Sequence, residues 1–299
     1  MSNINTANCS TNQLGTGLPS CIADVNYPVG VILTPKSWSE ARETTIDKAY
    51  IQQKVQEKVF IPIINATSFE QTTPDPTTQE FPNGVILVVR NGKPQFTFTY
   101  VASILFQKVL ASYNSYQQYN VIMVFDNDVL FLADDGTNLK GFSATHVNTN
   151  TYMFNTGSEV GQAKLQIQLL DNKQFNEGSI LDPNFDVTND INGIIDATIT
   201  GTAAAGGDIT VSVTAMLNEA SSVEGLTDNE FRILLNGVAE VPTTVSYDAT
   251  NETYVLTPTS TTTASDEVVV QLSDNLDSKV VAQVGDLFYQ GSSNTIIVA

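Results

Sequence analysis

The sequence predicts a mainly β protein: a β-barrel or β-sandwich body with one or two helices, followed by a C-terminal seven-strand immunoglobulin-like β-sandwich. Short apolar runs rich in Val, Ile and Thr recur between polar turn sequences, which is the pattern of half-buried strands. After residue 193, seven such runs fall within about 100 residues, the spacing of an immunoglobulin-like sandwich. The seven runs are Ile194–Thr200, Ile209–Ala215, Phe231–Leu235, Thr244–Tyr247, Thr253–Leu256, Glu267–Leu272 and Thr295–Val298.

Domain boundaries follow from changes in composition along the 299 residues, a length that suggests about two domains. Residues 1–28 are rich in Asn, Thr, Ser and Gly without a period, so we expect an N-terminal arm that becomes ordered on a neighbouring chain. Residues 29–185 are predicted to form the β-rich body. An acidic, polar linker is expected at Asn184–Asn192, and residues 193–299 form the predicted immunoglobulin-like domain.

Two segments have helical periodicity. Trp38–Lys58 carries one apolar stripe, and Ser39 is placed to cap the helix. Val101–Tyr113 is expected to form a second helix between strands. Its apolar residues share one face at helical spacing, so this face is predicted to pack on the core. These residues are Ile104, Leu105, Val109 and Leu110.

Turn sequences predict two hairpins and one long loop in the body. Gly84–Arg90 and Gln95–Tyr100 are expected to pair around the Asn-Gly dipeptide at 91–92, because Asn-Gly suits a two-residue hairpin turn. A second hairpin is expected around Asp126–Asp128. The prolines of Thr72–Pro82 predict an extended loop. Further strands are expected at Val29–Leu33, Val59–Ile64, Gly141–Val147, Thr151–Phe154 and Gln162–Leu170.

The net charge of −19 excludes binding of nucleic acid by phosphate neutralisation, which needs clustered Lys and Arg. Residues 192–299 contribute −12 and residues 1–191 contribute −7. We therefore expect no specific nucleic acid binding; an acidic wall would instead let DNA slide without sticking. The first 21 residues lack an apolar signal region and no run reaches 18 apolar residues, so neither secretion nor a membrane partner is expected.

No constellation of residues predicts catalysis, so we expect a protein that is not an enzyme and uses no cofactor and no metal. The acidic turns Asp126–Asp128 and Asp134–Gly136 lack the closing Glu of a calcium loop and are interpreted as ordinary turns. His146, the single histidine, accompanies no nucleophile motif. Trp38 is expected to pack in the core. Paired carboxylates for glycoside hydrolysis stay open, because 32 acids offer many pairings.

The two cysteines, Cys9 and Cys21, both lie in the N-terminal arm. Three interpretations stay open: free thiols beneath a neighbouring chain, a disulfide formed after release from the cell, or half of a metal site. A metal site would need two further ligands, and the chain has one histidine.

A series of short motifs runs through residues 8–180. They are Asn8-Cys9, Ser20-Cys21, the helical Thr45–Lys58 that leads into Phe60-Ile61-Pro62, Val88–Thr99, Phe131–Gly136 and Leu139–Phe142. In this order they resemble structural virion proteins of tailed phages that infect Bacteroidetes. The C-terminal domain is similar to the bacterial immunoglobulin-like modules appended to phage surface and tail proteins.

The resemblance implies a structural virion protein made in the bacterial host cytoplasm and then located in the virion. In outline the body resembles the tail-tube fold, whose subunits form hexameric rings around an acidic DNA channel. The implied partners are further copies of this chain and other virion proteins. Asp75, Glu80 and Glu159 are then expected to face the channel, because they lie in loops or at strand starts.

Two alternatives to the tube subunit stay open. The first is a capsid decoration or head-fibre protein whose immunoglobulin-like domain makes weak contact with cell-surface glycans. The second is a secreted glycan-active enzyme with an immunoglobulin-like accessory module. The absence of an exposed aromatic platform in the sequence pattern disfavours the second.

Overall fold

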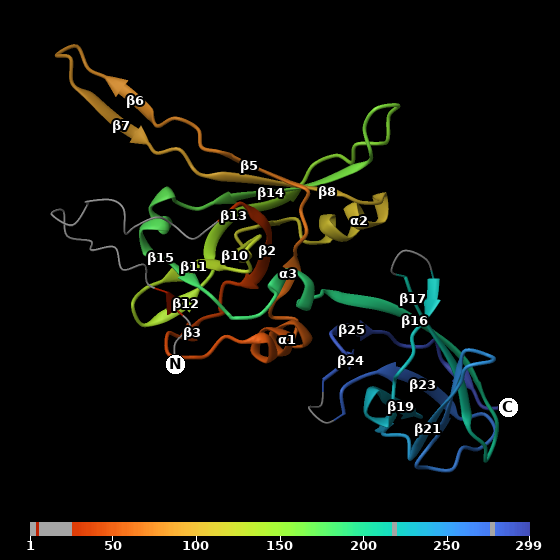
Figure 1. The fold of residues 1–299 in the computed structure, drawn as a ribbon. Helices are drawn as coiled ribbons and strands as arrows, with labels where there is room; N and C mark the ends of the chain where they lie inside the picture. The colour runs from red at the N-terminus through yellow and green to blue at the C-terminus, as the bar shows by residue number, and fades with distance from the viewer. Residues whose placement is uncertain (1–3, 6–25, 217–219, 276–278) are drawn as a thin grey trace. The chain divides into compact units, whose positions relative to one another are not determined.

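The computed structural model describes residues 4–5, 26–216, 220–275 and 279–299, and it is mainly β, as predicted (Figure 1). The chain divides into two compact units. Unit 1 comprises Met1–Ile51 and Val59–Ile191, and unit 2 comprises Gln52–Lys58 and Asn192–Ala299. Each unit has a hydrophobic core of its own. None of the helices in the described ranges is long and apolar enough to cross a membrane.

Unit 1 is built on one 13-stranded sheet. Its main path, in order across the sheet, is β1 (Ile4–Asn5), β15 (Gly178–Leu181), β11 (Leu130–Asp134), β10 (Tyr119–Phe125), β13 (Phe142–Thr149), β14 (Gln162–Leu169), β8 (Gln95–Val101) and β5 (Ser68–Thr72). Off this path lie β2 (Pro28–Pro35) on β10, β4 (Ile61–Ile63) on β2, β12 (Asn138–Lys140) on β11, β3 (Glu40–Ala41) on β12 and β9 (Ser115–Tyr116) on β13. A separate two-stranded sheet joins β6 (Thr77–Glu80) and β7 (Ile86–Arg90).

The alternation that the sequence shows in β14 is confirmed. Leu165, Ile167 and Leu169 are buried, whereas the Lys and Gln residues between them are partly exposed. The buried face joins a core rich in phenylalanine. The rings of Phe131 and Phe142, for example, lie 4.8 Å apart. β14 therefore has one face in the aromatic core and one partly exposed polar face, whereas β2 and β10 are buried on both faces.

The first predicted helix is shorter than expected. α1 spans Lys48–Gln56, because residues 40–41 form β3 and pair with β12 instead of continuing a helix. Ser39 is therefore not its cap. Asp47 takes that place, since its carboxylate accepts the backbone N–H of Tyr50 at 2.9 Å. Trp38 packs in the core as predicted, edge-on to Phe60 with ring centroids 4.9 Å apart.

The second predicted helix, α2, spans Ile104–Ser112, and Ser103 caps it by accepting the backbone N–H of Phe106. A third short helix, α3 (Val187–Asp190), and the 3₁₀ turn η2 (Asn172–Glu177) complete unit 1. α3 lies in the segment expected to be a solvated linker. That expectation is wrong for this part, because Val187 is fully buried and Thr188 donates to Asp128.

The predicted hairpin around Asp126–Asp128 is confirmed, with Met123 opposite Phe131. The predicted hairpin at 91–92 is wrong: β7 pairs with β6, and β8 pairs with β5 and β14. A Cβ on Gly92 would lie 1.6 Å from the carbonyl oxygen of Pro74, so the Asn-Gly segment passes close to residue 74 instead of turning. Thr72–Pro82 is not all loop, since it contains β6.

The turn of the β6–β7 hairpin lies at its tip instead, where Gly84 has φ +76°. Phe81 closes this turn by donating its N–H to the carbonyl of Val85 at 2.9 Å. The strand predicted at Thr151–Phe154 is also wrong. Only an isolated bridge between Met153 and Gln162 forms there.

Unit 2 is a two-sheet β-sandwich, as predicted. One sheet holds β21 (Thr244–Asp248), β22 (Thr253–Thr257), β17 (Ile209–Met216), β16 (Ile194–Ala203), β25 (Leu287–Gln290) and β24 (Ala282–Val284), with β18 (Ala220–Ser222) on β17. The other holds β20 (Val238–Glu240), β19 (Phe231–Leu235), β23 (Glu267–Leu272) and β26 (Ile296–Ile297), with the 3₁₀ turn η3 (Asp228–Glu230) before β19.

Each of the seven predicted runs in unit 2 lies on a strand. Four further strands, β18, β20, β24 and β25, are short and lack a long apolar run, so the sequence pattern did not predict them as strands. The core between the sheets is fully buried at residues such as Val211, Val213, Ile233 and Val270.

Candidate assembly surfaces

The predicted candidate residues do not form one site. Asp75 is exposed between β5 and β6, Glu80 is exposed at the end of β6, and Glu159 is exposed in the loop between β13 and β14. The hairpin precedes β8 and the loop adjoins the far end of β8, so the structure brings the third acid nowhere near the other two. Their orientation toward a channel stays a prediction about an assembled state. Cys9 and Cys21 lie outside the described residues.

In the parts of the chain with described coordinates, no group of three or more His, Cys, Asp or Glu side chains could hold a metal ion. His146 lies partly exposed on β13, and its ring centroid is 4.9 Å from that of Tyr116. This contact is aromatic packing, in keeping with a structural histidine.

The acidic sequence at Asp134–Gly136 forms a turn. The carboxylate of Asp134 accepts the N–H of Gly136, and that of Asp135 accepts the N–H groups of Thr137 and Asn138. These backbone hydrogen bonds to Asn138 and Thr137, then one to Lys140, lower the pKa of Asp135 to about 2. The carboxylates of Asp134 and Asp135 thus stabilise the turn by accepting its backbone N–H groups, as in an ordinary turn.

Exposed apolar residues form a continuous run along β7 of the β6–β7 hairpin. Val85–Val89 are 47–63% exposed, and Phe81 beside the turn is also exposed. The run does not alternate with polar residues, so apolar side chains stand on both faces of β7. An unalternated strand is typical of a position covered on both faces. We call these six residues, Phe81 and Val85–Val89, the hairpin patch.

The predicted buried face of α2 is largely exposed, which corrects the sequence analysis. Phe106 and Leu110, four residues apart, face the core, and the Phe106 ring packs edge-on against Tyr100 at 5.4 Å. The apolar residues on the outer side face solvent. Ile104, Leu105 and Val109 are 50–63% exposed. The helix is thus apolar on both sides, and the sequence period alone did not show which side packs inward.

The loop between β13 and β14 adds to this outer face of α2. Tyr152 in the loop donates its hydroxyl to the carbonyl of Ala102 at 2.9 Å, just before the helix. Val101 pairs in register with Gln162, just after the loop. Exposed apolar residues therefore cluster at this end of the sheet. We call the following set the helix patch: Val101, Ile104, Leu105, Val109, Met153, Phe154 and Val160.

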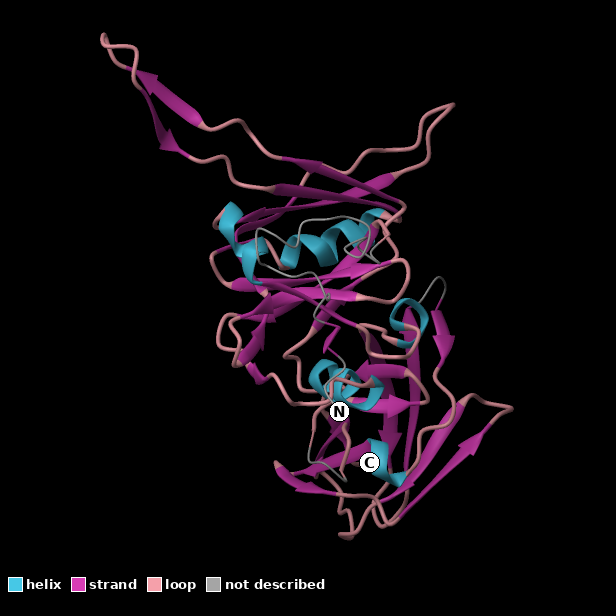
Figure 2. Ribbon diagram, turned by 60° about the vertical axis from the view of Figure 1, so that its left-hand side comes forward, coloured by secondary structure: helices cyan, strands magenta, loops and turns pink. Residues whose placement is uncertain are grey.

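The two patches lie at opposite ends of the β5–β8–β14 part of unit 1. β8 runs from Gln95, at the foot of the hairpin, to Val101, where the chain leads into α2. At about 3.3 Å per residue its seven residues span ~20 Å. Figures 1 and 2 show the hairpin and the β13–β14 loop leaving opposite ends of this sheet and diverging from each other. Thirteen of the twenty large exposed hydrophobic side chains in the described ranges belong to the two patches.

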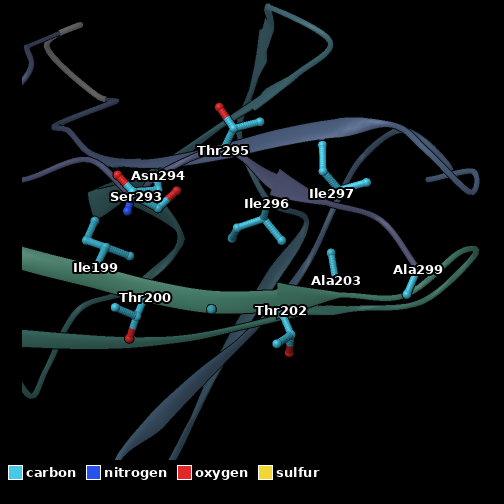
Figure 3. A pocket seen from close by; sticks show the side chains of 11 residues that line it. Ile199, Thr200, Thr202, Ala203, Ser293, Asn294, Thr295, Ile296, Ile297 and Ala299 are labelled. Atoms are coloured by element: carbon cyan, nitrogen blue, oxygen red, sulfur yellow. The ribbon is translucent and has the colours of Figure 1, made fainter.

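An open groove in unit 2 is a candidate glycan site (Figure 3). It encloses about 410 Å³ between β16 and the chain's last residues. These two segments meet at both ends of the groove, through an Ile199–Ser293 bridge and through the N–H of Ala299, which donates to Ala203. Its lining contains neither a charged nor an aromatic side chain. Because sugar and small-molecule sites rely on aromatic faces and convergent polar groups, the groove does not define a ligand.

Comparisons with known proteins add no function. No family model matches the chain, and no curated protein matches it. Among solved structures, the chain is similar to one described as the mouse coronavirus receptor-binding domain complexed with its murine receptor. That match has 9% identity and a TM-score of 0.21, and it covers 78% of this chain and 99% of the other. A TM-score this low carries no argument about the fold or the role of this protein.

Proposed function

We propose that this chain is a structural virion protein of a tailed phage, and specifically a tail-tube subunit that forms stacked rings around a DNA channel. The observation that carries the proposal is the concentration of exposed apolar residues in the hairpin patch and the helix patch. Monomeric proteins expose apolar residues mostly singly, and a contiguous apolar patch marks an interaction surface. A subunit of a repeating assembly needs such surfaces.

The placement of the patches also supports a ring or tube. Two different surfaces at opposite ends of one unit favour contacts between unlike faces of neighbouring copies, and contacts of this kind generate rings or open filaments. The proposed partners are other copies of the chain, in a hexameric ring, and other virion proteins. The net charge of −19 supports a passage through which DNA moves without binding.

Electron microscopy of the purified full-length protein tests the proposal. Rings or tubes are the expected particles. Single particles of one chain's size at high concentration contradict it. Binding to capsids as separate knobs, with no rings, would instead indicate the decoration or head-fibre role.

A further inference from the structure

We propose that the hairpin patch of one copy docks on the helix patch of the next copy, in a head-to-tail contact. This inference rests on the proposed function, because it names the partner of each surface within the assembly. The two patches are then the two halves of one interface.

The geometry of unit 1 requires a second copy for this contact. The hairpin leaves β8 at Gln95, and α2 follows β8 at Val101. The seven residues of the strand span ~20 Å, residues 90–94 lie between the strand and the hairpin patch, and the hairpin extends away from the helix (Figure 1). A hairpin therefore cannot fold back onto the helix patch of its own chain. In a neighbour shifted along the strand direction, the helix patch would meet the hairpin.

One contact of this kind covers both patches. If hairpins paired with hairpins in a two-fold contact, the seven residues of the helix patch would stay exposed in the assembly. The same objection applies to pairing of helix patches with each other, which would leave the hairpin patch exposed on both faces of β7. The head-to-tail contact leaves neither surface uncovered, and this is why we prefer it.

One pair of opposite charges supports the contact. Glu80 lies opposite Ile86 in the hairpin register and is the charged residue nearest the tip. Lys108 is the single charged residue of α2 and lies between Leu105 and Val109. The foot of the hairpin carries both signs, since Arg90 lies opposite Thr77, two residues after the acidic Asp75. A docking direction that brings Glu80 of one copy to Lys108 of the next would therefore be favoured by charge.

Two full-length variants test the pairing by complementation. The hairpin variant carries Leu87→Ser and Val89→Ser, and the helix variant carries Leu105→Ser and Val109→Ser. All four residues are at least half exposed, so both variants should keep the fold and the melting temperature of the unmodified chain. Each variant retains one working patch. Each alone should be monomeric by sedimentation velocity, whereas an equal mixture should give a heterodimer that grows no further.

Other results separate the failure of this inference from the failure of the proposed function. If the unmodified chain assembles but the mixture gives no heterodimer, the pairing is wrong while the assembly role stands. A helix variant that assembles like the unmodified chain also overturns the pairing. If that assembly is then lost on deletion of residues 1–25, assembly depends on the N-terminal segment and not on the helix patch. An unmodified chain that stays monomeric overturns both proposals.

A charge exchange gives a second test of the same contact. Lys108→Glu should weaken assembly about three- to tenfold, and Glu80→Lys in the same chain should restore most of the loss. Restoration by the second change requires that the two residues meet across the interface. Additive losses would show that they do not.

Discussion

Replacing Ile86 with Ser should weaken self-association without changing the stability of the fold. Ile86 is 62% exposed in the isolated chain, so its side chain has little to lose within unit 1. Complete burial of a side chain of this size stabilises by about 1.5–3 kcal/mol, and covering the exposed 62% in an interface would contribute about 1–2 kcal/mol. This range corresponds to an association constant about 5- to 30-fold lower.

The assay is sedimentation over a range of concentrations, read as the concentration at which half of the protein is assembled. Val238→Ser is the matched control, because Val238 is 70% exposed, lies in unit 2 and belongs to neither patch. The control should assemble like the unmodified chain. An equal loss in both variants would show that general surface hydrophobicity drives association. No loss in Ile86→Ser would refute the role given to the hairpin.

Three further predictions concern the core, the pH response and DNA. Leu165→Ala should lower the free energy of unfolding by about 2–5 kcal/mol in chemical denaturation. Gln166→Ala, on the other face of β14, should change it by less than about 0.5 kcal/mol. Equal effects of the two substitutions would contradict the assigned faces of β14. The pKa of Asp135 lies below its ordinary value, so its turn is stabilised above pH 3.8 and loses that contribution as the pH falls through about 2. NMR titration should therefore show Asp135 ionised at pH 3, and a midpoint near 4 would contradict this. In fluorescence anisotropy at low salt, the full-length protein should show no affinity for duplex DNA, and tight, salt-sensitive binding would end the channel interpretation.

Much of the strand pattern could be predicted because burial on one face leaves a period of two. β14 and the seven runs of unit 2 follow this rule, and each lies on a strand of the structure. The short strands β20 and β24 have three residues each and are held by their neighbours in the sheet. A run that short carries no readable period, so the sequence could not mark it.

The sequence did not predict the hairpin patch, because pairing between strands distant in the chain overrides the turn preference of Asn91-Gly92. Asn91 and Gly92 suggested a hairpin between β7 and β8, but β14 and β5 pair with the two edges of β8 and leave no edge for β7. The hairpin that does form joins β7 to a polar strand in a proline-rich segment. A usable signal was present: the run Val85–Val89 lacks alternation, and such a run requires cover on both faces.

The face of α2 shows a second limit. Ile104, Leu105, Val109 and Leu110 fit one stripe, yet the core takes Leu110 with Phe106 and leaves the others exposed. A helix with apolar residues on two sides satisfies the same period in two orientations. Only the sheet beneath it decides which side packs inward, and the remaining side is then available to a partner.

Sedimentation velocity of the unmodified full-length chain at rising protein and salt concentration tests the central claim most directly. The apolar contact is expected to persist in salt, and screening should reduce the mutual repulsion of subunits that carry a charge of −19 each. We therefore predict large species whose share grows with both concentrations. A single species of one chain's mass under all of these conditions would contradict the account.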